Sequence, residues 1–321
     1  MHPSASRAAP EAFRRGLSAV VANPGLILAP LAFGLAVLAS IVAPVLFLFL
    51  RVAGPLRAFG WKASTLRDPA AFVESCRNVL EGLQASPFVV LLGLLGLLAA
   101  LLLLTALAAF FRAGITGCLL AIDAHAAEDA PLAAFRHPVL GSVFWSSARR
   151  NGWRFFALVN LYGLALSCVV LLLVLPLGLA VFAGVSARGG LVAAAFVLFL
   201  LVLPLAFGGS IALRVLYLVA CRLAASEDVD ALEAVARAVS WTRASLSRIV
   251  LLYLLTLAAG FVSGFAFLVP RLVLSLVGGH SFVLFGLGMG VIVLAQMLVG
   301  FAYDLSVSGA FVSLWPAGRT P

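Results

Sequence analysis

Few side chains in this sequence could do chemistry, and the densest group of them is the run DAHAAED. The run contains Asp123, His125, Glu128 and Asp129. Carboxylates and imidazoles bind a metal ion when they converge in a fixed geometry, whereas a solvated loop needs no such geometry. We expect a solvated loop, with no metal and no cofactor. Phosphate-binding loops, serine-nucleophile elbows, zinc-protease motifs and paired cysteine ligands are absent from the sequence, so we expect a protein that is not an enzyme.

A second group of ionisable residues closes three apolar runs. Arg112, Arg214 and Asp304 each follow such a run, where a long side chain can reach water at little cost. Arg214 and Asp304 could instead form a polar pair within the membrane, but placement of each at the water boundary is the alternative that we favour. For the deeper polar residues we expect hydrogen bonds between packed spans rather than a polar path; they are Asn160, Ser167, Ser210, Thr256 and Gln296.

Basic residues cluster immediately before apolar runs. In SSARRNGWRFFALVNLY, residues 146–162, three arginines stand beside a tryptophan and two phenylalanines, and then the charge vanishes. Aromatic and basic side chains both favour the headgroup boundary of a bilayer. The pattern therefore predicts contacts with the headgroups of anionic lipids; the candidate residues are Arg14, Arg15, Arg149, Arg150, Arg154, Arg243 and Arg248.

The elements that position these residues must be transmembrane helices. Of the 321 residues, 64% are hydrophobic and only 10% are charged, whereas about a quarter are charged in soluble domains. Lipid offers no hydrogen-bond partner to a free backbone group, so the spans must be helical. We predict an all-α fold in a single membrane domain, residues 1–321. Its six spans fall in apolar runs that exceed the roughly 20 residues of a crossing: 25–50, 86–111, 155–187, 189–213, 249–270 and 272–303.

The distribution of charge predicts the orientation of these spans. About two thirds of the 21 Lys and Arg fall on the side of both termini, and basic residues stay in the cytoplasm. We therefore expect both termini to be cytoplasmic. The preference for Arg over Lys indicates a GC-rich genome, and we expect a bacterial cytoplasmic (inner) membrane. The net charge of +9 then reflects orientation and attraction to lipid headgroups, and we expect no binding of nucleic acid.

The sequence also predicts an internal repeat. The stretch from Arg149 to Gly184 aligns without gaps with the stretch from Arg243 to Gly278, and the N-terminal segment EAFRRGLSAVVANPGLIL supplies a looser third copy. We assign three two-helix units, residues 9–125, 136–225 and 228–315, each led by a cytoplasmic amphipathic helix. The first unit carries an outer insertion over residues 51–86.

The leading helices have apolar residues at helical spacing. The first has Phe13, Leu17, Val20 and Val21 on a face opposite Arg14, Arg15 and Ser18. The third has Leu232, Val235, Val239 and Leu246 opposite Glu233, Arg237 and Arg243. Such helices suit the headgroup boundary, although packing against the ends of the bundle is the alternative. Within the insertion, the stretch DPAAFVESCRNVLEGLQ predicts an outer amphipathic helix, residues 68–84, that packs on the bundle or receives a membrane-protein partner. Prolines at 176 and 270 are expected to kink or end their spans.

The leading segments EAFRRGLSAVVANPGLIL and DALEAVARAVSWTRASLSRIVLLYLL, each followed by paired spans, support one resemblance. The chain resembles poorly characterised bacterial membrane proteins related to the membrane domain found beside some glycerophosphodiester phosphodiesterases. The resemblance implies an architecture and no catalytic residues. We expect an accessory or scaffold protein that interacts with lipids or membrane-protein partners. The alternative is a transporter or a permease subunit, which the repeat and the charged helix ends would suit. The sequence does not indicate a substrate or an oligomeric state.

Overall fold

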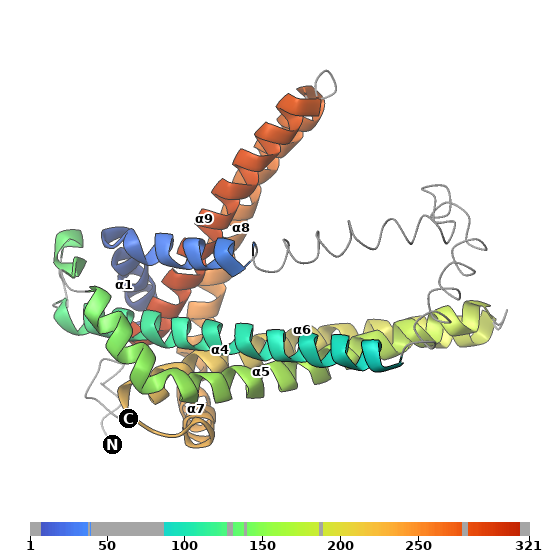
Figure 1. Cartoon of the computed structure of the whole chain (residues 1–321), viewed down its shortest axis with the longest axis horizontal. Coiled ribbons are helices and arrows are strands. Elements are labelled where there is room, and N and C mark those ends of the chain that lie inside the picture. Colours follow the sequence, from blue (N-terminus) through green and yellow to red (C-terminus); the bar gives the residue numbers. More distant parts are fainter. Residues whose placement is uncertain are drawn as a thin grey trace. The chain divides into compact units, whose positions relative to one another are not determined.

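A computed structural model describes residues 8–37, 39, 87–126, 131–137, 140–185, 189–277 and 282–314 of the chain. These residues form helices and no strand, which agrees with the predicted all-α class (Figure 1). The chain divides into two compact units. The smaller unit is Ala29–Leu104, and the larger unit comprises Met1–Leu28 and Thr105–Pro321. The helices are α1 (Ala9–Ala22), α4 (Pro87–His125), the short 3-10 helix η3 (Leu132–Phe135), α5 (Leu140–Val185), α6 (Gly189–Ser226), α7 (Ala231–Ala244), α8 (Leu246–Val277) and α9 (Phe282–Leu314).

Five of these helices, α4, α5, α6, α8 and α9, are long and apolar enough to cross a membrane. A sixth span is present if α1 and the helix Gly25–Val37, which meet at an angle of 74°, are counted as one bent span. The bend falls where Pro24 lacks the N–H that a continuous helix would use. The chain is therefore a multi-pass membrane protein. Residues 40–86, with the predicted outer helix 68–84, lie outside the described residues.

The spanning helices are longer than a bilayer requires. The 39 residues of α4 and the 46 residues of α5 correspond to roughly 58 and 69 Å of helix, about twice the thickness of the hydrocarbon core. Two prolines that we expected to kink or end spans lie within continuous helices, Pro176 in α5 and Pro270 in α8. Neither ends its helix, because α5 continues to Val185 and α8 continues to Val277.

Most buried residues of the larger unit lie at one end of these helices. Large apolar residues on the remaining part of the spans are exposed; examples are Leu164, Leu205 and Val262. Arg112, Arg214 and Asp304 lie where the exposed apolar part of α4, α6 and α9 gives way to the packed end. We call this packed end the base; it comprises residues 9–28, 105–126, 131–137, 140–158, 215–252 and 305–314.

The two leading helices bury only part of the face that their apolar pattern predicts. In α1, which packs against α9, the buried side chains include Ala12, Arg15, Ala19 and Val20, whereas Leu17 and Val21 of the predicted face are 45% and 55% exposed. In α7 the buried residues are Ala234, Ala238 and Trp241, and Leu232 is 72% exposed. Small residues allow helices to approach closely in membrane proteins. The large apolar residues are thereby left available for lipid.

The leading segment of the second unit differs from the other two. Residues 140–154 continue directly into the α5 span, whereas α1 and α7 are separate helices that end at Ala22 and Ala244. Asn151 and Gly152 do not interrupt α5, and both are buried. Gly152 is required there, because a Cβ at this position would lie 2.4 Å from the Phe110 ring of α4. A close contact between α4 and α5 thus replaces the break seen in α1.

Candidate functional site

Arg15 is the buried centre of the base and does not face lipid. Its side chain is 1% exposed, and its Nε donates a hydrogen bond to Asp123 Oδ1 at 2.9 Å. Nη2 donates to the backbone carbonyls of Asp123 and Ala126, at 3.1 and 2.9 Å. The last turn of α4 leaves backbone carbonyls without an N–H partner in the helix, and the Arg15 guanidinium donates to them. The negative end of the helix dipole also favours a positive charge at this place. The expected headgroup contact at Arg15 is replaced by this structural role.

Polar groups from two further elements complete this buried cluster. Ser313 of α9 donates a hydrogen bond to Asp123 Oδ1 at 2.8 Å, and the Phe135 ring of η3 lies 5.2 Å from the Arg15 guanidinium carbon. Arg222 of α6, 2% exposed, donates to the carbonyl of Val312 at 3.2 Å and lies over the Trp241 ring. Buried charges are tolerated when they are paired and hydrogen-bonded. The cluster therefore ties α1, α4 and α9 together.

Arg150 and Arg154 are held by a carboxylate that follows α6. Arg150 Nη2 lies 3.0 Å from Asp228 Oδ2, and Arg154 donates to Asp228 Oδ1. Asp228 has φ 60°, in the left-handed region that Asp tolerates better than most residues. Hydrogen bonds from Arg150 and Arg154 lower the pKa of Asp228 to about 2, so the carboxylate is charged at neutral pH. These two arginines link α5 to the connection between α6 and α7.

The other four candidate arginines are differently placed. Among the residues that the structure describes, no carboxylate lies within ion-pair distance of Arg14, Arg149, Arg243 or Arg248. Arg14, Arg149 and Arg243 are exposed, and Arg248 is half-buried. Near Arg149 along α5, Trp145 and Trp153 are 63% and 68% exposed. These arginines, unlike the other three, retain a charge that the described part of the base does not neutralise.

Arg214 and Asp304 form an ion pair between α6 and α9. Arg214 Nη2 lies 2.7 Å from Asp304 Oδ1, and Arg112 Nη2 of α4 lies 3.9 Å from Oδ2. Asp304 is 41% exposed, so the pair is only partly desolvated and contributes modestly to stability. Arg112 also lies over the ring of Tyr217, which stacks on Tyr162. The pair that we considered the lesser alternative is thus present in the structure, with Arg112 as a third member.

The deeper polar residues mostly bond to their own helix. Asn160, Ser167, Ser210 and Thr256 donate to backbone carbonyls three or four residues earlier, as short polar side chains in helices often do. Gln296 is the exception, because its carbonyl oxygen accepts a hydrogen bond from Arg271 of α8. The expectation of hydrogen bonds between spans therefore holds for Gln296 and fails for the other four.

The run DAHAAED is divided by the end of α4. Asp123 is committed to Arg15, and the His125 ring lies 5.7 Å from that of His137. Glu128 and Asp129 lie outside the described residues. Where the structure describes side chains, no three His, Cys, Asp or Glu residues come together as metal ligands.

Comparison of the chain with protein-family models, curated proteins and solved structures gives no match. The function is therefore inferred from the side chains of the base and from the surfaces of the spans. They offer arginines without an acidic partner in the described residues, a half-exposed carboxylate between two arginines, and apolar grooves.

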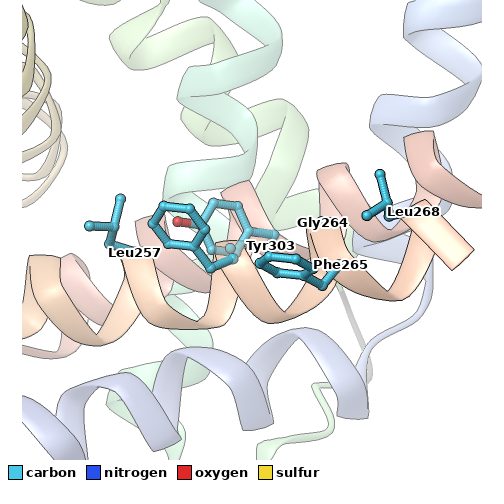
Figure 2. A pocket seen from close by; sticks show the side chains of 7 residues that line it. Leu257, Gly264, Phe265, Leu268 and Tyr303 are labelled. Carbon is cyan, nitrogen blue, oxygen red and sulfur yellow. The ribbon is translucent and has the colours of Figure 1, made fainter.

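One apolar groove, of about 510 Å³, runs along α8. Figure 2 shows Leu257, Phe265 and Leu268 along this helix beside Tyr303 of α9. The Tyr303 hydroxyl, the only polar side-chain group in the lining, donates to the Thr256 carbonyl at 2.8 Å. With no charged side chain, the groove has nothing to orient a polar ligand. We regard it as ordinary lipid-facing surface.

Proposed function

We propose that this protein is a non-enzymatic, multi-pass protein of a bacterial cytoplasmic membrane that binds anionic lipids through its base. Both termini and the base lie on the cytoplasmic side. The protein serves as an accessory or scaffold for membrane lipids or for membrane-protein partners. One observation carries this proposal: four arginines of the leading segments have no acidic partner among the described residues, at the end of the spans where exposed tryptophans gather.

The division among the seven arginines supports this reading. Arg15, Arg150 and Arg154 are committed to Asp123 and Asp228. The other four are exposed or half-buried, so their guanidinium groups are accessible to lipid phosphates. Lipid phosphates supply the missing charge at the headgroup level, each basic residue contributing on the order of 1 kcal/mol.

Replacing the four unpaired arginines by glutamine should remove the preference for anionic lipid. The variant carries Arg14→Gln, Arg149→Gln, Arg243→Gln and Arg248→Gln. Purified protein in neutral detergent micelles is titrated with phosphatidylglycerol or phosphatidylcholine of the same acyl chains, and lipid binding is followed by the shift of the thermal unfolding midpoint. We expect the unchanged protein to bind phosphatidylglycerol more tightly than phosphatidylcholine. In the variant, the ratio of these two affinities should fall at least about tenfold.

The matched control removes the same amount of charge from the predicted outer insertion. It replaces Arg51, Arg57, Arg67 and Arg77 by glutamine. We expect this control to keep the lipid preference of the unchanged protein. An equal loss in both variants would attribute the preference to net charge alone, and no preference in the unchanged protein would refute the proposal.

The half-exposed Asp304 favours a second candidate function, transport. A carboxylate between two arginines, where the exposed apolar part of α4, α6 and α9 gives way to the base, could bind and release a charged solute, because ionisable groups at membrane depth often mark pathways. Under this alternative, protein in liposomes should move a solute across the bilayer, and Asp304→Asn should abolish the flux while the protein still folds. Asp228→Asn, which also removes an arginine-bound carboxylate, is the control and should leave the flux intact. Equal flux in the unchanged protein and in Asp304→Asn would exclude this role for Asp304.

A further inference from the structure

A second apolar cavity, of about 430 Å³, lies between α6, α7 and the beginning of α8. Ligand pockets in proteins commonly measure about 300–1,000 Å³. The cavity extends from the part of α6 that precedes the base down to α7. We call it the α7 crevice; it is lined by Gly208, Ile211, Ala212, Val215, Leu216, Val239, Thr242, Arg243, Leu246, Ile249, Val250, Tyr253 and Leu254.

The α7 crevice differs from the groove on α8 in having a charged end. Arg243 is the one charged side chain in its lining, and no acidic residue lines it. Arg243 is exposed and meets no carboxylate among the described residues. Arg243 belongs to α7, so the one charged residue of the lining lies at the end formed by α7, and apolar residues of α6 and α8 line the rest.

The α7 crevice also contains a polar group without a partner. The Thr242 hydroxyl is buried and has no hydrogen-bond partner in the described part of the chain. A buried hydroxyl without a partner is unfavourable, and an oxygen from a bound molecule would relieve that cost. Thr242 and Arg243 both line the α7 crevice and belong to the same turn of α7, so the polar part of a ligand at this end would lie near both.

An apolar trough with a cation and a hydroxyl at one end matches an amphiphile with an anionic head. We propose that the α7 crevice binds one anionic glycerophospholipid, with an acyl chain along α6 and α8 and the phosphate on Arg243. The assignment deepens the proposed function and rests on it, since it names one site and one ligand among the lipid contacts of the base. Phosphatidylcholine would enter the same trough with the same phosphate, but its choline ammonium offsets the negative charge that Arg243 meets, so it should bind more weakly.

The role of charge is tested by Arg243→Gln, with Arg248→Gln as the matched control. Both arginines are unpaired among the described residues, but only Arg243 lines the α7 crevice. Native mass spectrometry counts the lipids that remain bound to detergent-purified protein supplied with phosphatidylglycerol or phosphatidylcholine. Arg243→Gln should weaken retention of the most tightly bound phosphatidylglycerol about fivefold, and Arg248→Gln should leave that lipid in place. Equal retention in the two variants would overturn the role of Arg243.

The place of the acyl chain is tested by filling the α7 crevice. A Cβ at Gly208 meets no atom within 4 Å, so Gly208→Leu should fold and occupy the trough. Gly264→Leu is the matched control, because Gly264 is equally open but lines the groove on α8 (Figure 2). Gly208→Leu should displace phosphatidylglycerol and phosphatidylcholine alike, whereas Gly264→Leu should retain both. Equal lipid retention in the two glycine variants would overturn the assignment of the chain.

Two further results separate this site from the wider proposal. Glycerol 3-phosphate, which has the headgroup charge and no acyl chain, should not displace the lipid at equal concentration; displacement would show a phosphate site and refute the lipid. If the fourfold arginine variant loses its preference for anionic lipid but Arg243→Gln and Gly208→Leu do not, the base binds lipid elsewhere. The proposed function would then stand and the α7 crevice would be excluded.

Discussion

Asp123→Ala is expected to destabilise the protein by about 3–5 kcal/mol, the range seen when one partner of a buried ion pair is removed. Asp123 and Arg15 are 8% and 1% exposed, so water cannot replace the lost carboxylate. The guanidinium would keep its bonds to the carbonyls of Asp123 and Ala126, but its charge would be buried without a counterion. Ser313 would lose its acceptor as well.

Thermal and denaturant unfolding in detergent, followed by tryptophan fluorescence, measure this effect. Asp228→Asn is the control, because Asp228 also pairs with arginine but is half exposed, where an ion pair contributes little, and Asn tolerates the left-handed backbone at this position. The double variant Arg15→Met with Asp123→Leu should recover most of the loss, since apolar side chains of similar volume often replace a buried pair without cost. Equal effects of Asp123→Ala and Asp228→Asn would show that the base does not depend on the buried pair.

The transmembrane character of the chain follows from composition, because long uncharged runs have only one stable form in lipid. That argument predicts helices and their approximate limits, and it explains why five of the predicted spans have counterparts in α4, α5, α6, α8 and α9. It does not predict which charged residue meets which. Arg15 and Asp123 are separated by 108 residues, and neither residue stands out from its neighbours in the sequence.

The apolar pattern of the leading helices predicted their buried face only in part, for a related reason. Hydrophobic periodicity indicates the face that water avoids, but in a membrane protein lipid accepts that face as readily as protein does. The face that packs against other helices is then the one with the smallest side chains. In α1 it contains Ala12, Gly16 and Ala19, with the buried Arg15 among them. A signal for this face was present, since small residues recur in α1 at three- and four-residue spacing.

Arg15 and Arg14 illustrate why lipid contacts cannot be assigned from charge alone. The two residues are adjacent, yet one is buried against α4 and the other is exposed. Successive residues on a helix point about 100° apart, so one of two neighbouring arginines turns inward when the helix packs. The same geometry separates Arg149, which has no carboxylate within ion-pair distance among the described residues, from its neighbour Arg150, which binds Asp228. Lipid contact is therefore a property of the face that remains after packing.

Gly16→Ala is expected to separate α1 from α9 and to destabilise the protein by roughly 1–3 kcal/mol, the usual range for overpacking, or more. A Cβ on Gly16 would lie 2.4 Å from the backbone nitrogen of Ala310 and 2.4 Å from the backbone oxygen of Ser306. Both are main-chain atoms of a regular helix, so no side-chain rotation relieves the clash. Alanine is the better helix former by about 1 kcal/mol, and the loss should appear despite that gain.

The matched control is Gly163→Ala in α5, where an added Cβ meets no atom within 4 Å. It brings the same gain in helix propensity without a clash, so its unfolding midpoint should stay equal or rise. Because Arg15 is the neighbour of Gly16, displacement of α1 should also weaken the bonds of Arg15 to the end of α4. Gly16→Ala combined with Asp123→Ala should therefore cost less than the sum of the two single changes. An additive result, or a Gly16→Ala variant as stable as Gly163→Ala, would contradict a packed contact between α1 and α9.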